Sequence, residues 1–159
     1  MEDKQIVEKI NVLYVDDEVE NLNAFKAAFR RIYNVHTAES AQEGRDIIDR
    51  HPIAIILTDQ RMPGMTGVEF LASIIGAHPD PIRMLITGYS DINAVIDAVN
   101  KGHIYKYISK PWDNEYLKTT IDQAYEVYAL RKENKKLTAE LIKVNEQLEF
   151  MLRQKLNAE

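Results

Sequence analysis

Hydrophobic and polar positions follow two different patterns along the first part of the chain, one typical of buried strands and one typical of helices. Five short apolar runs, each ending at polar or turn-forming residues, have the length expected of buried strands. They cover residues 11–15, 33–37, 53–58, 82–87 and 104–108. Between them, apolar residues recur every three or four positions, which is the spacing of an amphipathic helix. The expected helices cover residues 19–31, 40–50, 67–76 and 90–100, and a last helix begins near residue 113.

Strict alternation of strands and helices predicts an α/β fold. Right-handed crossover connections then give a doubly wound (βα)5 parallel sheet with helices on both of its faces. The runs 53–58 and 82–87 are the most continuously apolar, so we expect them at the centre of the sheet. Ser40 and Glu43 form a capping box that marks the start of the second helix.

The last helix continues beyond this domain with a narrow apolar stripe. The stripe follows a heptad that predicts a two-stranded coiled coil, and a polar residue at one a position favours a parallel, in-register homodimer. A single long surface helix is the alternative. We therefore divide the chain into a domain at 8–128 and a helical extension at 129–159, and we expect the natural protein to continue past the coiled coil. The predicted seam has Val127, Asn134, Leu141 and Leu148 at a, and Leu130, Leu137, Val144 and Met151 at d.

Composition narrows the class of protein. The 159 residues are 45% hydrophobic, which suits one globular domain with an appendage. The absence of cysteine excludes disulfide scaffolds, thiolate metal sites and thiol catalysis. A net charge of −5 argues against direct binding of nucleic acid. With no apolar signal segment at the N-terminus and no apolar run of membrane-spanning length, we expect a cytoplasmic protein without a membrane partner.

Charged and hydroxyl side chains follow four of the five expected strands. Asp16 and Asp17 follow the first, Asp59 ends the third, and Thr87 and Lys110 follow the fourth and fifth. In a parallel sheet these ends meet at one edge, where such folds place their ligands. Three neighbouring carboxylates repel one another unless a hard cation such as Mg²⁺ neutralises them. A carboxylate beside such a cation can attack a phosphoryl group to give an aspartyl phosphate, and a hydroxyl and an ammonium can bind the added charge.

These residues resemble the signature of the receiver domain of two-component response regulators. The resemblance covers about residues 10–128 and implies a flavodoxin-like (βα)5 domain. It implies phosphoryl transfer from a phosphohistidine on a sensor histidine kinase or a phosphotransfer protein. The matching elements are Asp16-Asp17, residues 59–67, Thr87-Gly88 and Lys110-Pro111. A weaker likeness, carried by residues 86–91 and 105–112, is to receivers attached to cyclic-di-nucleotide phosphodiesterases or to enhancer-dependent transcription regulators.

The resemblance implies a role for each residue of the site. Asp59 is the phosphoacceptor, and Thr87 and Lys110 bind the oxygens of the phosphoryl group. Tyr107 turns inward when the threonine moves. The Lys110–Pro111 peptide bond is expected to be cis. The implied Mg²⁺ ligands are Asp17 directly, Asp16 mostly through water, Asp59, and the backbone carbonyl of Arg61.

Three functions are compatible with this pattern. The first is a phosphorylation-dependent switch, which removes its own phosphoryl group slowly and passes the change through the last helix to a dimeric output. The second is a protein-binding module with the same fold that does not use phosphorylation. The third is a metal-dependent phosphohydrolase with an aspartate nucleophile. That reading is disfavoured because Arg61 stands two residues after Asp59, where such enzymes place a general acid.

Overall fold

A computed structural model of the chain describes residues 9–88 and 92–158. Its strands and helices alternate strictly, as the hydrophobic pattern predicts. The strands are β1 (Asn11–Val15), β2 (Asn34–Ala38), β3 (Ile55–Asp59), β4 (Ile82–Thr87) and β5 (Lys106–Ser109). The helices are α1 (Val19–Phe29), α2 (Ala41–Arg50), α3 (Gly67–Ile74), α4 (Ile92–Asn100) and α5 (Asn114–Asn157).

The five strands form one parallel sheet in the order β2-β1-β3-β4-β5. Every residue of β3 is buried, and β4 lies next to it, which confirms the two most apolar runs as interior strands. The chain turns from one half of the sheet to the other between β1 and β3. At such a switch point, the loops after neighbouring strands diverge and leave a crevice at the carboxyl edge.

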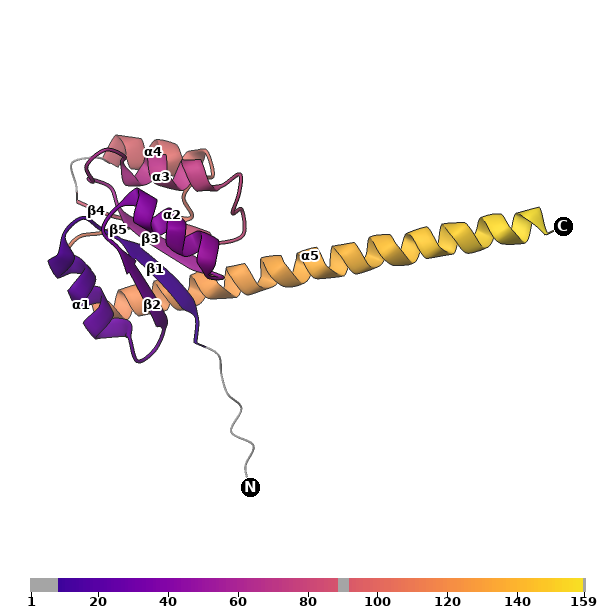
Figure 1. The fold of residues 1–159 in the computed structure, drawn as a ribbon, viewed down its shortest axis with the longest axis horizontal. Coiled ribbons are helices and arrows are strands. Elements are labelled where there is room, and N and C mark those ends of the chain that lie inside the picture. The colour runs from indigo at the N-terminus through magenta and orange to yellow at the C-terminus, as the bar shows by residue number, and fades with distance from the viewer. Residues whose placement is uncertain (1–8, 89–91, 159) are drawn as a thin grey trace, which may run out of the picture.

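Helices cover both faces of the sheet (Figure 1). On one face, α1 and α5 bury Phe25, Phe29, Leu117 and Ile121 against β1, β3 and β4. On the other face, α2, α3 and α4 supply a second core that includes Phe70. This is the doubly wound α/β fold expected from the sequence.

Side-chain caps fix the start of two helices on the second face. Ser40 accepts a hydrogen bond from the backbone N–H of Glu43, which is one half of the predicted capping box, whereas the Glu43 carboxylate accepts the N–H of Glu39 rather than that of Ser40. Thr66 likewise accepts from the N–H of Glu69 at the start of α3. The expected start of α4 at residue 90 or 91 lies outside the described residues.

Helix α5 belongs to the domain at its beginning and leaves it afterwards (Figure 1). It has 44 residues, which corresponds to a length of about 66 Å. Its first turns bury Leu117, Ile121 and Ala124, whereas its residues from 129 to 157 are exposed. In the described part of the chain, none of the helices, not even this long one, is apolar enough to span a bilayer.

Polar contacts from separate parts of the domain hold α5 in place. The Tyr33 hydroxyl, at the end of the α1–β2 connection, donates to Asp122 Oδ1 at 2.7 Å. Further along the helix, Lys135 forms an ion pair with Asp80 in the loop before β4. The helix therefore contacts the domain beyond residue 128, where the sequence analysis places the domain boundary.

Candidate functional site

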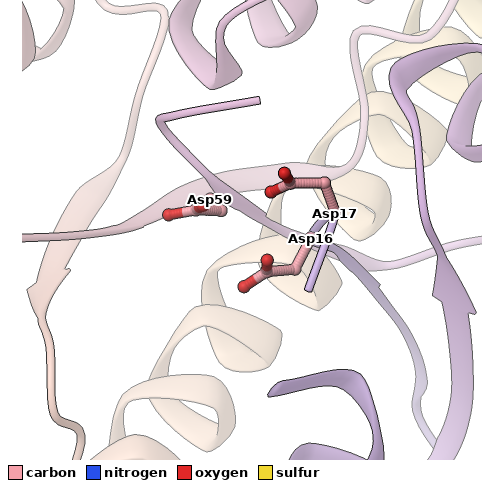
Figure 2. A group of neighbouring side chains, drawn as sticks. All are labelled: Asp16, Asp17 and Asp59. Atoms are coloured by element: carbon pink, nitrogen blue, oxygen red, sulfur yellow. The ribbon is translucent and has the colours of Figure 1, made fainter. Parts of the chain in front are cut away.

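Three carboxylates meet at the carboxyl edge of the sheet (Figure 2). Asp16 and Asp17 follow β1, and Asp59 is the last residue of β3. Because β1 pairs directly with β3, with Val15 opposite Thr58, the loops that carry these acids start side by side. One oxygen of each carboxylate lies within 4.8 Å of the others. Asp16 is completely buried and Asp17 is exposed, while Asp59 is 8% exposed.

Lys110 reaches this cluster from the end of β5. Its Nζ lies 2.9 Å from Asp59 Oδ1 and 3.4 Å from Asp16 Oδ2. Burial alone would lower the pKa of Lys110, but its hydrogen bond to Asp59 and the nearby carboxylates raise that pKa above its ordinary value. Burial raises the pKa of Asp59, and the bond from Lys110 offsets part of that increase. The Lys110–Pro111 peptide bond is cis, as expected.

Thr87 closes the same pocket from the end of β4. Its side chain is buried, and its hydroxyl donates to the carbonyl of Gly88 at 3.1 Å. The backbone N–H of Lys110 donates to the carbonyl of Thr87 at 2.9 Å, which ties the two phosphoryl-binding candidates together. The resulting cavity has a volume of about 280 Å³ and is lined by Asp17, Glu18, Asp59, Arg61, Thr87, Gly88 and Lys110.

Tyr107 is the candidate residue that the structure does not bring to the acids. It lies on β5 with 36% of its surface exposed. It lines a separate cavity of about 690 Å³ between β5 and the start of α5, together with Trp112 and Tyr116. In this conformation the tyrosine faces the surface rather than the core.

The loop after Asp59 is held by a residue that the sequence analysis did not single out. Gln60 is 5% exposed, and its Oε1 accepts the backbone N–H of Val68 at 2.9 Å. Its backbone carbonyl accepts the N–H of Gly67 at 3.0 Å. A Cβ at Gly67 would lie 2.2 Å from the carbonyl oxygen of Asp59, so only glycine fits there. These contacts set the path of the loop that contains Arg61.

Asp16 is also held by partners that sequence reasoning missed. Its Oδ2 accepts the Tyr14 hydroxyl at 2.6 Å and Asn21 Nδ2 at 3.0 Å, and its Oδ1 accepts the backbone N–H of Glu18 at 2.9 Å. Burial, followed by the hydrogen bond to Asp16, raises the pKa of Tyr14 far above its ordinary value. The tyrosine therefore stays protonated and remains a donor.

The donor set fits a hard divalent cation. Mg²⁺ is bound in proteins by one or two carboxylates together with carbonyl oxygens and water. Asp17 and Asp59 both line the cavity, and so does Arg61, whose backbone carbonyl is the third candidate ligand. A cation there would also relieve the repulsion among three adjacent acids.

A doubly wound parallel sheet with three acids, a threonine and a lysine at its carboxyl edge defines the receiver class of signalling domain. The model of the response regulator receiver domain family matches residues 12–122, and the chain belongs to this family. It is thus a receiver domain of the two-component type, which implies a histidine kinase as its partner. Receiver domains in general bind Mg²⁺ at an acidic pocket, the place that Asp16, Asp17 and Asp59 form here.

Relatives and solved structures agree with this assignment. The chain is 41% identical over 141 residues to the hydrogenase transcriptional regulatory protein HoxA of Cupriavidus necator, covering 89% of this chain and 28% of that protein. A response regulator receiver domain protein from Clostridium thermocellum is 28% identical, with a TM-score of 0.72 over 76% of this chain and 98% of its own. The signal receiver domain of an HD domain-containing protein from Pseudomonas fluorescens Pf-5 is 27% identical, with a TM-score of 0.75 over 84% and 98%.

The chain spans only 25–28% of the length of the first curated relatives that it matches. These include hydrogenase and other transcriptional regulatory proteins. The likeness therefore concerns their receiver part, and the activities of the whole relatives are not carried over to this chain.

Proposed function

We propose that this chain is a phosphorylation-dependent switch in which Asp59 accepts a phosphoryl group from the phosphohistidine of a sensor histidine kinase or a phosphotransfer protein. The observation that carries the proposal is the position of the Asp59 carboxylate. It borders a cavity of about 280 Å³ that Lys110 and Thr87 also line. The carboxylate of Asp59, the ammonium group of Lys110 and the hydroxyl of Thr87 thus surround one cavity at the surface.

The transfer forms one bond and breaks one. A carboxylate oxygen of Asp59 attacks the phosphorus atom, and the phosphorus–nitrogen bond of the donor histidine breaks as the new phosphorus–oxygen bond forms. The imidazole leaves with the electron pair of that bond. Mg²⁺, when held by Asp17, Asp59 and the Arg61 carbonyl, supplies positive charge that stabilises the phosphoryl oxygens. In this reading Asp16 acts on the cation mostly through water.

Lys110 and Thr87 then bind the product. The ammonium of Lys110, now 2.9 Å from Asp59 Oδ1, is placed to pair with a phosphoryl oxygen instead. The Thr87 hydroxyl gives up its hydrogen bond to the Gly88 carbonyl and donates to another phosphoryl oxygen instead. Its movement leaves space for Tyr107 to turn inward from its present exposed position. The face formed by α4, β5 and α5 repacks as a result, in the manner of phosphorylation switches that bias a two-state element.

The proposed output is a homodimer through α5. Among the predicted seam residues, Leu130, Leu137, Leu141, Val144, Leu148 and Met151 are between 49% and 70% exposed in the single chain. A repeating apolar stripe along an exposed helix is stabilised by a matching helix. Val127 instead packs partly against the core of the domain, so the free part of the seam begins at Leu130. Its partner in this proposal is the same helix of a second copy.

Incubation with acetyl phosphate and Mg²⁺, followed by intact-mass spectrometry, tests the proposal. We expect one phosphoryl group per chain, stable enough to be detected, and no incorporation in Asp59→Asn. Asp97→Asn is a matched control, because Asp97 is an exposed aspartate on α4 that pairs with Lys101 at the surface. It should incorporate phosphoryl as the wild type does.

The other outcomes separate the alternatives. An unmodified wild-type chain would favour a binding module that does not use phosphorylation. Rapid, repeated release of phosphate from the donor would favour a phosphohydrolase. Equal loss of incorporation in the Asp97 variant would show that Asp59 is not the specific acceptor.

A further inference from the structure

We infer that Tyr14 is a positioning residue for the divalent cation, holding the carboxylate of Asp16 while Lys110 stays on Asp59. The inference deepens the proposed function and rests on it, since it assumes that the acidic pocket binds Mg²⁺. Tyr14 lies in β1, two residues before the first acid, where its side chain contributes to the buried core beneath the pocket.

The hydrogen bond between Tyr14 and Asp16 is the shortest contact that this acid makes with a protein donor. The Tyr14 hydroxyl lies 2.6 Å from Asp16 Oδ2, compared with 3.0 Å for Asn21 Nδ2 and 3.4 Å for Lys110 Nζ. A hydrogen bond to an ionised acceptor is stronger than one between neutral groups. The completely buried Asp16 carboxylate is thus held by the Tyr14 hydroxyl, the Asn21 amide and the backbone N–H of Glu18 at 2.9 Å, with the lysine at a longer distance.

Because Tyr14 holds Asp16, Lys110 can remain paired with Asp59, the proposed phosphoacceptor. Its Nζ lies 0.5 Å closer to Asp59 than to Asp16, at 2.9 Å against 3.4 Å. Without the hydroxyl, Asp16 would lose its shortest hydrogen bond and keep Asn21, the Glu18 N–H and Lys110 as donors, of which Lys110 is the charged one. A shift of the ammonium toward Asp16 would leave Asp59 less well paired and the three acids in a different mutual arrangement.

The ring of Tyr14 is itself fixed by aromatic neighbours. Its centroid lies 5.0 Å from that of Phe25 on α1 and 5.9 Å from that of Trp112, which it meets edge-on. Trp112 follows Lys110 and Pro111 directly in the chain. The ring therefore packs between α1 and the segment that follows Lys110, and these contacts fix the position of its hydroxyl at Asp16.

Residues that orient a metal ligand without touching the metal have a measurable effect on affinity. Removing such a partner typically weakens metal binding by about 10–100-fold. Tyr14→Phe deletes one oxygen atom and keeps the ring, so its aromatic packing is preserved. We expect the Mg²⁺ dissociation constant of Tyr14→Phe to rise by about tenfold.

A matched control exists in the same chain. Tyr33 is another buried tyrosine, 1% exposed, and its hydroxyl donates to a carboxylate oxygen of Asp122 at 2.7 Å. It precedes the amino end of β2, whereas the acidic pocket lies at the carboxyl edge of the sheet. Tyr33→Phe loses the same kind of hydrogen bond away from the pocket. Its Mg²⁺ affinity should equal that of the wild type.

Isothermal titration with Mg²⁺ on the full chain, together with melting temperatures measured in EDTA, tests the inference. Weaker Mg²⁺ binding in Tyr14→Phe but not in Tyr33→Phe supports it, when the melting temperatures show that both variants are folded at the temperature of the titration. Unchanged or tighter binding in Tyr14→Phe, with normal binding by the wild type, overturns the role of Tyr14 and leaves the proposed function intact. A wild-type chain that binds no Mg²⁺ overturns this inference and the metal part of the proposed function together.

A second variant keeps the test decisive if Tyr14→Phe does not fold. Asn21 lies on α1, is only partly buried, and donates to the same oxygen of Asp16 at 3.0 Å. Asn21→Ala should weaken Mg²⁺ binding in the same direction but by less, because the longer bond contributes less. An unchanged affinity in Asn21→Ala would overturn the view that these donors position Asp16.

Discussion

Replacing Leu141 by alanine should weaken the proposed dimer strongly. Each buried CH₂ group contributes about 0.8 kcal/mol, so the three carbons lost from a fully buried leucine correspond to roughly 2.4 kcal/mol. Leu141 is 61% exposed in the single chain, and a partner helix can cover about that share, or about 1.5 kcal/mol. Each dimer contains the residue twice. The total of about 3 kcal/mol raises the dissociation constant about 100-fold, since 1.4 kcal/mol corresponds to a factor of ten.

The neighbouring Ile142 supplies the control for this substitution. It is 54% exposed, and its replacement by alanine also removes three carbons. It occupies position b of the heptad, outside the a and d seam that a two-stranded coiled coil buries. Ile142→Ala should therefore leave the dissociation constant close to that of the wild type, although the change in composition is nearly the same.

Sedimentation equilibrium over a range of protein concentrations measures both variants. The expected result is a monomer–dimer equilibrium in which only Leu141→Ala shifts strongly toward the monomer. Equal shifts in the two variants would show that apolar exposure in general, rather than the predicted seam, drives association. A wild-type chain that stays monomeric at micromolar concentration would refute the homodimer.

Two further predictions concern the stability of the domain. Gly67→Ala should lower the free energy of unfolding in urea by about 3 kcal/mol or more, because its Cβ would lie 2.2 Å from a backbone oxygen of Asp59; Gly76→Ala, where no atom lies within 4 Å, should not have this effect. Burial, and then the charge of His51, lower the pKa of His36, whose Nε2 has no hydrogen-bond partner among the described residues. A histidine with a lowered folded-state pKa binds fewer protons when folded, so stability should fall as pH drops below about 6.5 and be unaffected above it. His36→Gln should flatten this slope, and an unchanged slope would contradict the assignment.

The layout of the fold was predictable because burial shapes the sequence directly. Strand β3 is buried on both faces, so Ile55, Ile56 and Leu57 are apolar in succession instead of alternating with polar residues. The site followed from the same pattern, since the acids and Lys110 stand immediately after strands that had to be parallel. The predicted ends of strands and helices were less accurate. For example, β5 begins at Lys106 rather than at residue 104. The N–H of Tyr105 donates to the carbonyl of Arg83, but the residue pairs between β4 and β5 begin one position later, with Met84 opposite Lys106.

The supporting residues of the site could not be predicted in the same way. In the sequence Tyr14 is one more residue of an apolar strand, and nothing local shows that its hydroxyl ends at Asp16. Gln60 is a polar residue at the start of a loop, and only the path of the chain shows that it is buried against the start of α3. The ion pair between Lys135 and Asp80 joins positions 55 residues apart. Such contacts depend on tertiary packing, which hydrophobic periodicity does not encode.

The construction of α5 bears on how a change at the pocket would reach a dimer. Its sequence from Asn114 to Asn157 contains neither glycine nor proline, the residues at which helices most often bend. Leu117 and Ile121 fix its first turns in the core, and Tyr33 and Asp80 contact it further along. A change in its tilt is therefore transmitted along the helix rather than absorbed by it. For the rigid part of the helix beyond the contact between Lys135 and Asp80, which is about 33 Å long, a tilt of about 5° moves the far end by roughly 3 Å. That displacement is perpendicular to the helix axis, so in the proposed dimer a small repacking near Tyr107 would change the separation and crossing angle of the two helices.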